Sequence, residues 1–568
     1  MTERRHREHD ELRYSIRSIF KYLGPHQFSS ILIVASDFYD TTVGKWIGQT
    51  PTWLDPEAAQ QNNVRMLFTS ELYGDKKDEL PVFSSLALES QFWNVPRTQD
   101  RENGGDVMVY FNDDMFLASE HSVSDFWNPL VGITIQVDPL IWVQNQNASV
   151  NDFQADWNSE WTALRYSNWL LSTSPSLPSS PLSYLSLFFP FYLICISGTN
   201  SVAQRFGWRR RPYIAHHGKA LSRTILKELS ETFPSLHQSS ANRFRCESID
   251  VSTSFLHIHY IIERHREVLL QSFLVHRSDI NSDGFLDYDE RLALVQHLKV
   301  ALKERYPRKS LNDLPRAMKT ANLLDMKLSK AVWTGLDGYP FSFREPHNPI
   351  TQEIPKAANE PMFTMSDLPD KRTPEWDFFE MCLTSDFLDE RLKDAKVDMN
   401  MFFGLLAKDH AYCGDMLLNI LIASQERGLH HLLPGTGHPK YQELVEGLNR
   451  YAYTITQTSS EFIMAKNVEI LKKGFARALR TLKYKGLAQI CVNDDLEYGQ
   501  TIMGKKMDTT LRGILQGYFG GLTKDAGYSP VEVKESLKET INDAGLEFWK
   551  ASGHKGGPGY DKEAVLLK

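Results

Sequence analysis

Cysteine is scarce in this sequence, and neither sign of charge dominates. Five cysteines occur in 568 residues and none forms a CxxC pair, so no zinc site is expected. With 63 basic and 71 acidic side chains the formal net charge is −8, and nothing in that balance suggests nucleic acid as a partner. The length exceeds what one hydrophobic core supports and predicts roughly two to four domains.

Two kinds of segment are missing or out of place. Met1–Arg17 is strongly charged, so no signal peptide or anchor is expected at the amino terminus. Charge is absent from residues 166–204, and Ser172–Gln204 consists mainly of Ser, Pro, Leu and Phe. Its apolar core, Leu182–Ile196, is shorter than the ~20 residues of a membrane span and contains Pro190. Because these residue types share pyrimidine-rich codons, we predict an unspliced intron or a disordered surface loop, with a membrane helix as the alternative.

Two buried strands end in the same acidic sequence. The apolar run Val107–Phe111 is followed by Asn112, Asp113 and Asp114, and Ile490–Val492 is followed by Asn493, Asp494 and Asp495. A single copy is as readily a polar turn that closes a hairpin. Two adjacent carboxylates repel each other unless a cation or a proton relieves them, and the repeat favours one divalent-metal site built from both copies. We expect carboxylates of the two segments to lie on the order of 4–8 Å apart.

The twelve residues 279–290 match an EF-hand calcium loop at every position. The expected Ca²⁺ ligands are Asp279, Asn281, Asp283, the carbonyl of Phe285, Asp287 through water, and Glu290 through both carboxylate oxygens. Gly284 occupies the position that needs a tight turn, and amphipathic stretches flank the loop. No second loop is visible in the sequence, so a structural clamp is favoured over a calcium switch.

Helical periodicity is clear elsewhere in the chain. It predicts helices over Glu11–Tyr22, Leu221–Phe233, Phe255–His276, Trp376–Lys393 and Lys466–Lys485. Three histidines on the Phe255–His276 helix are not spaced as metal-ligand pairs and are expected to be core or solvated residues: His257, His259 and His265. Cys382 and Cys413 flank a helical segment and are predicted to form a disulfide if the chain is lumenal.

Several runs together resemble the Stealth family of sugar-1-phosphate transferases. The matching runs, in the family's order, are ELRYSIRS at Glu11–Ser18, LPVFSSLALE at Leu80–Glu89, YFNDDMFLA at Tyr110–Ala118, RRRPYIAHHGKALSRTILKEL at Arg209–Leu229, RFR at Arg243–Arg245 and VNDD at Val492–Asp495. An EF-hand after the third block is a feature of eukaryotic members, and the pattern looks closest to the fungal xylosylphosphotransferases of the family.

The resemblance implies transfer of a sugar-1-phosphate from a UDP-sugar to a mannose-containing glycan, with release of UMP, in the Golgi lumen. The expected cofactors are Mg²⁺ or Mn²⁺ at the active site and Ca²⁺ in the EF-hand. The site residues carried over from the family's blocks are Asn112, Asp113, Asp114, His216, Arg245, Asn493 and Asp494. Asp113, Asp114, Asp494 and Asp495 would hold the metal, Arg209 and Arg211 would bind phosphate, and His216 could take the acceptor's proton.

The predicted fold is α/β: a Rossmann-like catalytic domain split in sequence, an inserted helical EF-hand, and a mostly helical carboxyl-terminal part. The boundaries are 1–171 and 205–258 for the catalytic domain, 172–204 for the anomalous insertion, 259–306 for the EF-hand, 307–371 for a loop-rich insertion, 372–450 for a helical region and 451–568 for the remainder.

The first block of the family should precede Glu11 and is expected to be missing, which favours an incomplete gene product. The alternative function is a non-catalytic, calcium-stabilised glycan-binding or scaffold protein derived from such an enzyme. A homo-oligomer is kept as an option.

Overall fold

The computed structural model describes residues 9–96, 105–143, 159–173, 206–207, 209–242, 244, 249–303, 331–341, 378–379, 382–383, 385–424, 429, 431–456, 460–485, 488–493, 502–519, 532 and 566–567. The α-helices are α1 (Glu11–Tyr22), α2 (Pro56–Gln61), α3 (Thr69–Tyr73), α4 (Ser85–Glu89), α5 (Ser159–Thr173), α6 (Arg223–Thr232), α7 (Ser235–Ser239), α8 (Thr253–Gln271), α9 (Tyr288–Lys303), α12 (Met399–Gly404), α13 (Ala411–Ala423), α14 (Tyr441–Arg450), α15 (Val468–Lys485) and α16 (Ile502–Phe519).

The strands are short and alternate with these helices. They are β1 (Ile31–Ala35), β2 (Asp37–Asp40), β3 (Lys45–Gly48), β4 (Val64–Phe68), β5 (Val107–Tyr110), β6 (Met115–Leu117), β7 (Trp127–Asn128), β8 (Gly132–Ile135), β9 (Val137–Val143), β10 (Arg211–Ile214), β11 (Lys219–Ser222), β12 (Phe285–Leu286), β13 (Ala331–Thr334), β14 (Val397–Asp398), β15 (Tyr453–Thr456), β16 (Ser460–Met464), β17 (Gln489–Asn493) and β18 (Leu566–Leu567). The mixed α/β class predicted from the sequence is confirmed at this level.

The sheets are small and mixed. The described strands form separate sheets of two to four strands, with parallel pairing in β1–β4, β8–β15 and β16–β17. Within the described ranges no single doubly wound sheet joins them, so the Rossmann-like arrangement stays a prediction. The helix expected over Trp376–Lys393 is confirmed at residues 378, 379 and 382, but it does not continue to Lys393, because Ser385–Leu388 and Glu390–Leu392 form short 3-10 turns.

Local sequence explains features of two helices near the strands β5, β6 and β11. α1 has the predicted bounds, and its apolar face buries Ile16, Ile19 and Phe20. Ser222 caps the start of α6, because its hydroxyl accepts a hydrogen bond from the Ile225 amide at 3.2 Å and so satisfies one of the amides left open at a helix start. β11 therefore leads directly into α6 without a loop.

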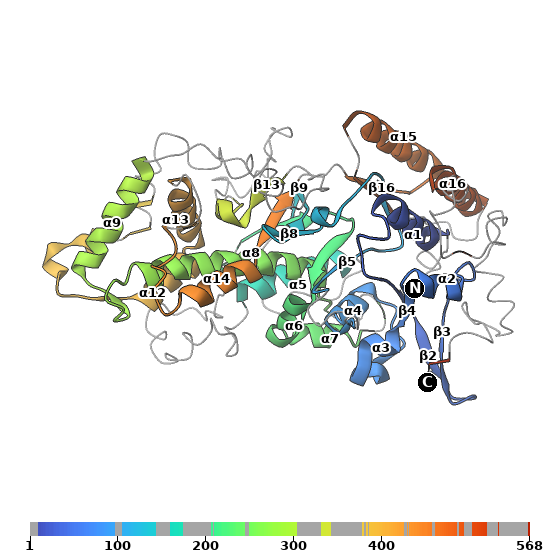
Figure 1. Cartoon of the computed structure of the whole chain (residues 1–568), viewed down its shortest axis with the longest axis horizontal. Helices are drawn as coiled ribbons and strands as arrows, with labels where there is room; N and C mark the ends of the chain where they lie inside the picture. Colours follow the sequence, from blue (N-terminus) through green and yellow to red (C-terminus); the bar gives the residue numbers. More distant parts are fainter. Residues whose placement is uncertain are drawn as a thin grey trace.

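α8 runs through the middle of the molecule, and Figure 1 shows it between the sheets at one end and α9 and α12 at the other. It crosses the boundary predicted at residue 258, and one hydrophobic core packs around it. His257, His259 and His265 are buried in the core, one of the two alternatives predicted for them, and burial lowers their pKa values to about 3, 3 and 4 respectively. The His257 Nε2 accepts a hydrogen bond from the Ser222 amide at 2.9 Å, which ties α8 to the start of α6.

A buried ion cluster holds α8 to its neighbours. Arg211 donates to the Glu263 carboxylate of α8 at 3.0 and 2.8 Å, and the Tyr339 hydroxyl donates to the same oxygen at 3.0 Å. Arg266 pairs with Asp415 of α13 and donates to the carbonyls of Ala407 and Ala411.

Arg209 belongs to the same cluster, 3.6 Å from both Glu263 and Asp415. Both Arg209 and Arg211 are buried, at 3% and 0% exposure. The expectation that they bind substrate phosphate is therefore wrong: the two carboxylates already engage their guanidinium groups inside the core.

The predicted disulfide between Cys382 and Cys413 is confirmed, with Cα atoms 5.6 Å apart. It joins the segment before α12 to α13. Residues 174–204 of the anomalous insertion lie outside the described residues. The loop-rich insertion is described only at residues 331–341, which contain β13 and the turn Gly335–Asp337. None of the described helices has both the length and the apolar character that crossing a bilayer requires.

The ion cluster makes a prediction about stability. Burial alone would raise the pKa of the Glu263 carboxyl, but Arg209, Arg211 and Arg266 outweigh it and hold that pKa below its usual value. Glu263→Gln keeps the shape and removes the charge, leaving three buried guanidinium groups with one carboxylate. We expect a loss of about 3–5 kcal/mol of unfolding free energy, measured by denaturant unfolding. Glu231→Gln, on the exposed face of α6, is the matched control and should change stability little. Equal effects of the two substitutions would contradict a structural role for the cluster.

Candidate active site

The first Asn-Asp-Asp segment is a junction between two sheets. β5 pairs antiparallel with β11, whereas β6 pairs antiparallel with β17. Residues 112–114 turn the chain from one sheet to the other, closed by a hydrogen bond from the Met115 amide to the Asn112 carbonyl at 3.2 Å. Since β5 and β6 do not pair with each other, the segment is not a hairpin turn.

The second segment arrives at the same place on β17. In the antiparallel register Cys491 lies opposite Met115, and the Val492 amide donates to the Asp114 carbonyl at 3.0 Å. Asn493, the last residue of β17, therefore lies beside the first segment, as the repeated strand endings predicted. Asp494 and Asp495 lie outside the described residues, so the distance between the carboxylates remains a prediction.

His216 enters from the connection between β10 and β11. The Gly218 amide donates to the Gln489 side chain of β17 at 2.9 Å, and a Cβ at residue 218 would lie 2.6 Å from the Phe111 ring. Only glycine permits that approach, which brings the His216 connection against the end of β5. The His216 ring meets the Phe462 ring of β16 edge to face at 5.3 Å between centroids.

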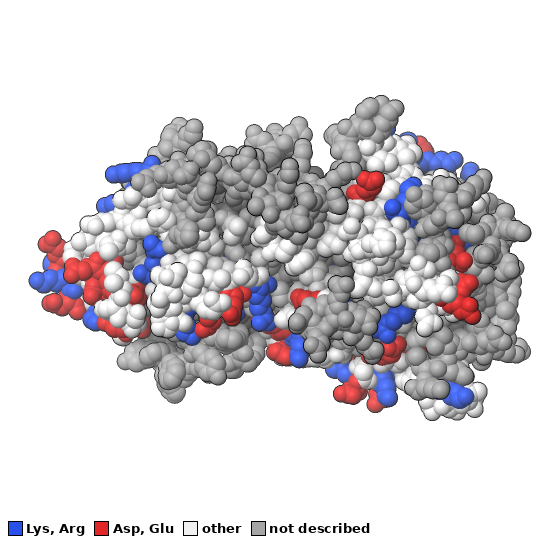
Figure 2. Space-filling model, viewed as in Figure 1, with Lys and Arg blue, Asp and Glu red and all other residues white. Residues whose placement is uncertain are grey.

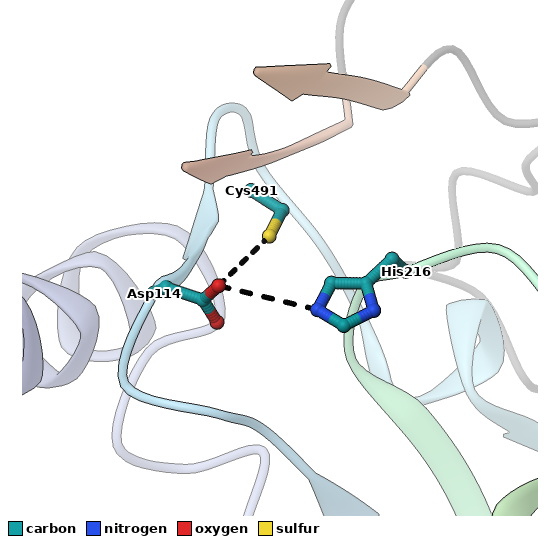
Figure 3. A group of neighbouring side chains, drawn as sticks. All are labelled: Asp114, His216 and Cys491. Atoms are coloured by element: carbon teal, nitrogen blue, oxygen red, sulfur yellow. Dashed lines mark hydrogen bonds and ion pairs between the residues drawn. The ribbon is translucent and has the colours of Figure 1, made fainter. Parts of the chain in front are cut away.

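Three side chains from these segments form one cluster, shown in Figure 3. The Cys491 thiol donates to Asp114 Oδ2 at 3.3 Å, and His216 Nε2 lies 4.0 Å from the same oxygen. The side chains of His216 and Asp114 are 23% and 17% exposed, so the cluster is accessible, whereas Cys491 is buried.

The electrostatics of the cluster follow from its partial burial. Burial raises the pKa of Asp114 to about 7, with a further contribution from the Asp113 carboxyl. Burial and the Asp114 charge raise the pKa of Cys491 well above its usual value, so its sulfur carries a proton and acts as a donor. Asp114 Oδ1 is buried and has no hydrogen-bond partner among the described residues. An unpaired carboxylate oxygen of this kind calls for a proton or a cation.

Lys219 is a further site residue that the sequence analysis did not select. It lies opposite Tyr110 in the β5–β11 pair, with its ammonium 5.7 Å from the centre of that ring. Burial lowers the pKa of Lys219, and the negative charges of Glu89 and Asp114 oppose that shift. Lys219 lies within the run Arg209–Leu229 and Cys491 lies within the strand before Asn493, and this position was the only signal that the sequence carried for either residue.

The metal-ligand atoms of Asp114, His216 and Cys491 lie within 4.8 Å of one another. A protonated thiol is a poor ligand for Mg²⁺ or Mn²⁺, which prefer oxygen. The group therefore fits a hard cation through Asp114, whose Oδ1 is unpaired, with further oxygens expected from Asp494 or Asp495. Asp113 is exposed beside Asp114, Asn112 is partly buried, and Arg245 lies outside the described residues.

Two of the three cluster residues lie in regions that match known proteins. The conserved region 2 of Stealth proteins matches residues 5–134, which include Asp114, and conserved region 3 matches residues 215–263, which include His216.

Curated relatives agree with these regions. The chain is 31% identical over 204 residues to the 3-O-α-D-mannopyranosyl-α-D-mannopyranose xylosylphosphotransferase of Cryptococcus neoformans var. grubii, covering 35% of this chain and 19% of that protein. It is 27% identical over 157 residues to a capsular polysaccharide phosphotransferase of Haemophilus influenzae, covering 27% of this chain and 36% of that protein. The chain thus spans about a fifth of the length of the fungal relative. Two conserved regions of Stealth proteins and several phosphotransferase relatives agree, and together they support a Stealth-family sugar-phosphate transferase.

Proposed function

We propose that this chain transfers a sugar-1-phosphate from a UDP-sugar to a hydroxyl of a mannose-containing glycan. The observation that carries the proposal is the meeting of Asp114, His216 and Cys491 from three distant segments at one accessible cluster. A carboxylate, an imidazole and a nearby lysine suit phosphoryl transfer, which depends mainly on positioning and on stabilising charge.

In the proposed step, an acceptor oxygen attacks the phosphorus that carries the sugar. The new P–O bond forms as the bond to the UMP oxygen breaks, and UMP leaves. His216 takes the acceptor's proton, and the Asp114 carboxylate, 4.0 Å from Nε2, favours the imidazolium that results. The edge-to-face contact between the His216 and Phe462 rings holds the imidazole in place for this role. Lys219 contributes positive charge beside the reacting phosphate.

Mg²⁺ or Mn²⁺, held by Asp114 together with Asp113, Asp494 or Asp495, would neutralise charge on the diphosphate. Asn112, Asn493 and Arg245 are proposed to orient the donor. UDP-xylose is the proposed donor, by analogy with the name of the fungal relative. Location in the Golgi lumen is proposed as well, and it is supported by the Cys382–Cys413 disulfide because such bonds persist in oxidising compartments.

Calcium is the second proposed cofactor, bound by the loop 279–290 as an EF-hand. The loop has the required backbone, because Ser282 and Gly284 adopt positive φ of 58° and 84°. Asp279 accepts hydrogen bonds from the amides of Asp283 and Gly284 at 3.1 and 2.8 Å, which draws the loop around its carboxylate. Glu290 reaches back across the loop to the Ile280 amide at 2.7 Å. We propose that the ion acts as a structural clamp.

Activity tests the proposal on the full-length product of the gene. UDP-xylose and UDP-N-acetylglucosamine are offered with an α-1,3-linked mannose disaccharide, and UMP release is measured. His216→Asn should lower kcat about 10²–10⁴-fold by removing the proton acceptor. His26→Gln, an exposed histidine outside the site, should leave kcat unchanged. A protein that binds the disaccharide yet releases no UMP from either donor would support the non-catalytic glycan-binding alternative instead.

Metal binding has its own pH dependence. Asp114 has a pKa of about 7 in the metal-free protein. Below that pH the carboxyl is mostly protonated, so it must lose its proton before it can bind a cation. The apparent Mn²⁺ affinity should therefore fall about tenfold per unit as the pH drops below 7, and it should level off above. Asp114→Asn and Asp494→Asn should each weaken Mn²⁺ binding, measured by electron paramagnetic resonance of the free ion. If Asp494→Asn binds Mn²⁺ with the wild-type affinity, the two Asn-Asp-Asp segments do not share one metal site.

A further inference from the structure

The predicted calcium loop pairs with a second loop whose sequence does not match the EF-hand pattern. β12, inside the loop, pairs antiparallel with β14, and each strand leads directly into a helix, α9 and α12 respectively. Figure 1 shows α9 and α12 together at the end of the molecule away from the active site. Two loops joined by a short antiparallel ribbon are the way in which paired EF-hands meet.

The register aligns the two loops position by position. Leu286, at loop position 8, lies opposite Val397, and Phe285, at position 7, lies opposite Asp398. If Val397 also stands at position 8, the second loop covers residues 390–401, and α12 begins at position 10, as α9 does in the first loop.

A repeated hydrogen bond supports this alignment. In the first loop Asp287, at position 9, accepts a bond from the amide of Glu290, at position 12, at 2.9 Å. In the second loop Asp398, at position 9, accepts a bond from the amide of Met401, at position 12, also at 2.9 Å. The same cap therefore starts the outgoing helix in both halves.

The second loop lacks the chemistry for calcium. Leu392 stands at position 3, Ala395 replaces the glycine at position 6, and Met401 replaces the bidentate glutamate at position 12. Ala395 does not adopt positive φ, which among the described non-glycine residues is confined to Asp10, Asn63 and Ser282. The loop closes through backbone bonds such as that from the Ala395 amide to the Leu392 carbonyl at 3.1 Å.

Two basic side chains join the halves. Arg291, buried directly after the first loop, donates to the carbonyls of Leu392 and Ala395 at 3.0 and 2.9 Å. Lys396 reaches in the opposite direction and forms an ion pair with Asp283, the ligand at position 5, while lying over the Phe285 ring. Figure 2 shows acidic and basic side chains intermixed at this end of the molecule.

We propose that residues 390–401 are a second, non-binding EF-hand and that its Lys396 sets the calcium affinity of the first. The positive charge on a ligand carboxylate competes with the ion, so Ca²⁺ binds more weakly than the loop sequence alone would allow. This inference rests on the proposed calcium site at 279–290.

Calcium titration by calorimetry tests the proposal. Mg²⁺ is present to fill the hard-cation sites, and the heat measured with Glu290→Gln is subtracted, so that only binding that depends on Glu290 is counted. Lys396→Gln should tighten the Glu290-dependent affinity roughly two- to fivefold, in keeping with the strength of an exposed ion pair. Lys396→Arg keeps the positive charge and should therefore leave the calcium affinity at its wild-type value. Lys393→Gln, an equal charge change at an exposed lysine on the same loop, is the matched control and should leave the affinity nearly unchanged.

Hydrogen exchange tests the pairing separately. The Met399 amide donates to the Gly284 carbonyl at 3.1 Å, so calcium should slow exchange in residues 390–401 in the wild type but not in Glu290→Gln.

Each failure points to a different premise. Without any Glu290-dependent binding, the calcium site itself is wrong. If the wild type binds calcium but Lys396→Gln changes nothing, or Lys393→Gln does as much, the role of Lys396 is wrong. Calcium binding that survives Glu290→Gln and is lost in Asp394→Asn would show that the second loop binds an ion.

Discussion

Charge buried along α8 is the constraint on which the rest of the structure depends. Two carboxylates, Glu263 and Asp415, pair with three guanidinium groups inside the core, so one positive charge is in excess. Such a cluster contributes little net stability compared with apolar packing. Removing one member is nevertheless strongly destabilising, because the remaining charges are then buried without full compensation. β10, α8 and α13 are thereby fixed in one relative arrangement, and the connection that carries His216 follows directly from β10.

The candidate active site depends on a different principle, because distant segments of the chain share one sheet there. Asp114 is fixed by its own backbone, which accepts the Val492 amide, so its carboxylate stands beside Cys491 whatever its side chain binds. The backbone thus positions the group before any ligand arrives, and preorganised groups stabilise charge without the cost of rearrangement.

Sequence reasoning succeeded where the signal was periodic or chemical. The bounds of α1, the strand before residue 112 and the Cys382–Cys413 pair follow from spacing and residue type. It failed for Arg209 and Arg211, because a basic run looks the same whether its partners are phosphates or carboxylates far along the chain.

The second calcium-type loop was invisible for a related reason. Leu392 and Met401 erase the ligand pattern, and only the backbone register reveals the relationship. Lys219 and Cys491 carried no pattern of their own. The single doubly wound sheet is undecided, since short strands leave no record in the sequence of which neighbour they join.

The pairing of β6 with β17 has a consequence for how the protein is made. Asp114 and Cys491 are separated by 377 positions, so at 5–20 residues per second β6 leaves the ribosome roughly 20–75 s before its partner strand exists. During that time Met115, Phe116 and Leu117, all fully buried in the finished fold, present an unpaired apolar edge. The candidate active site needs both strands, so it is completed only after β17 has been synthesised.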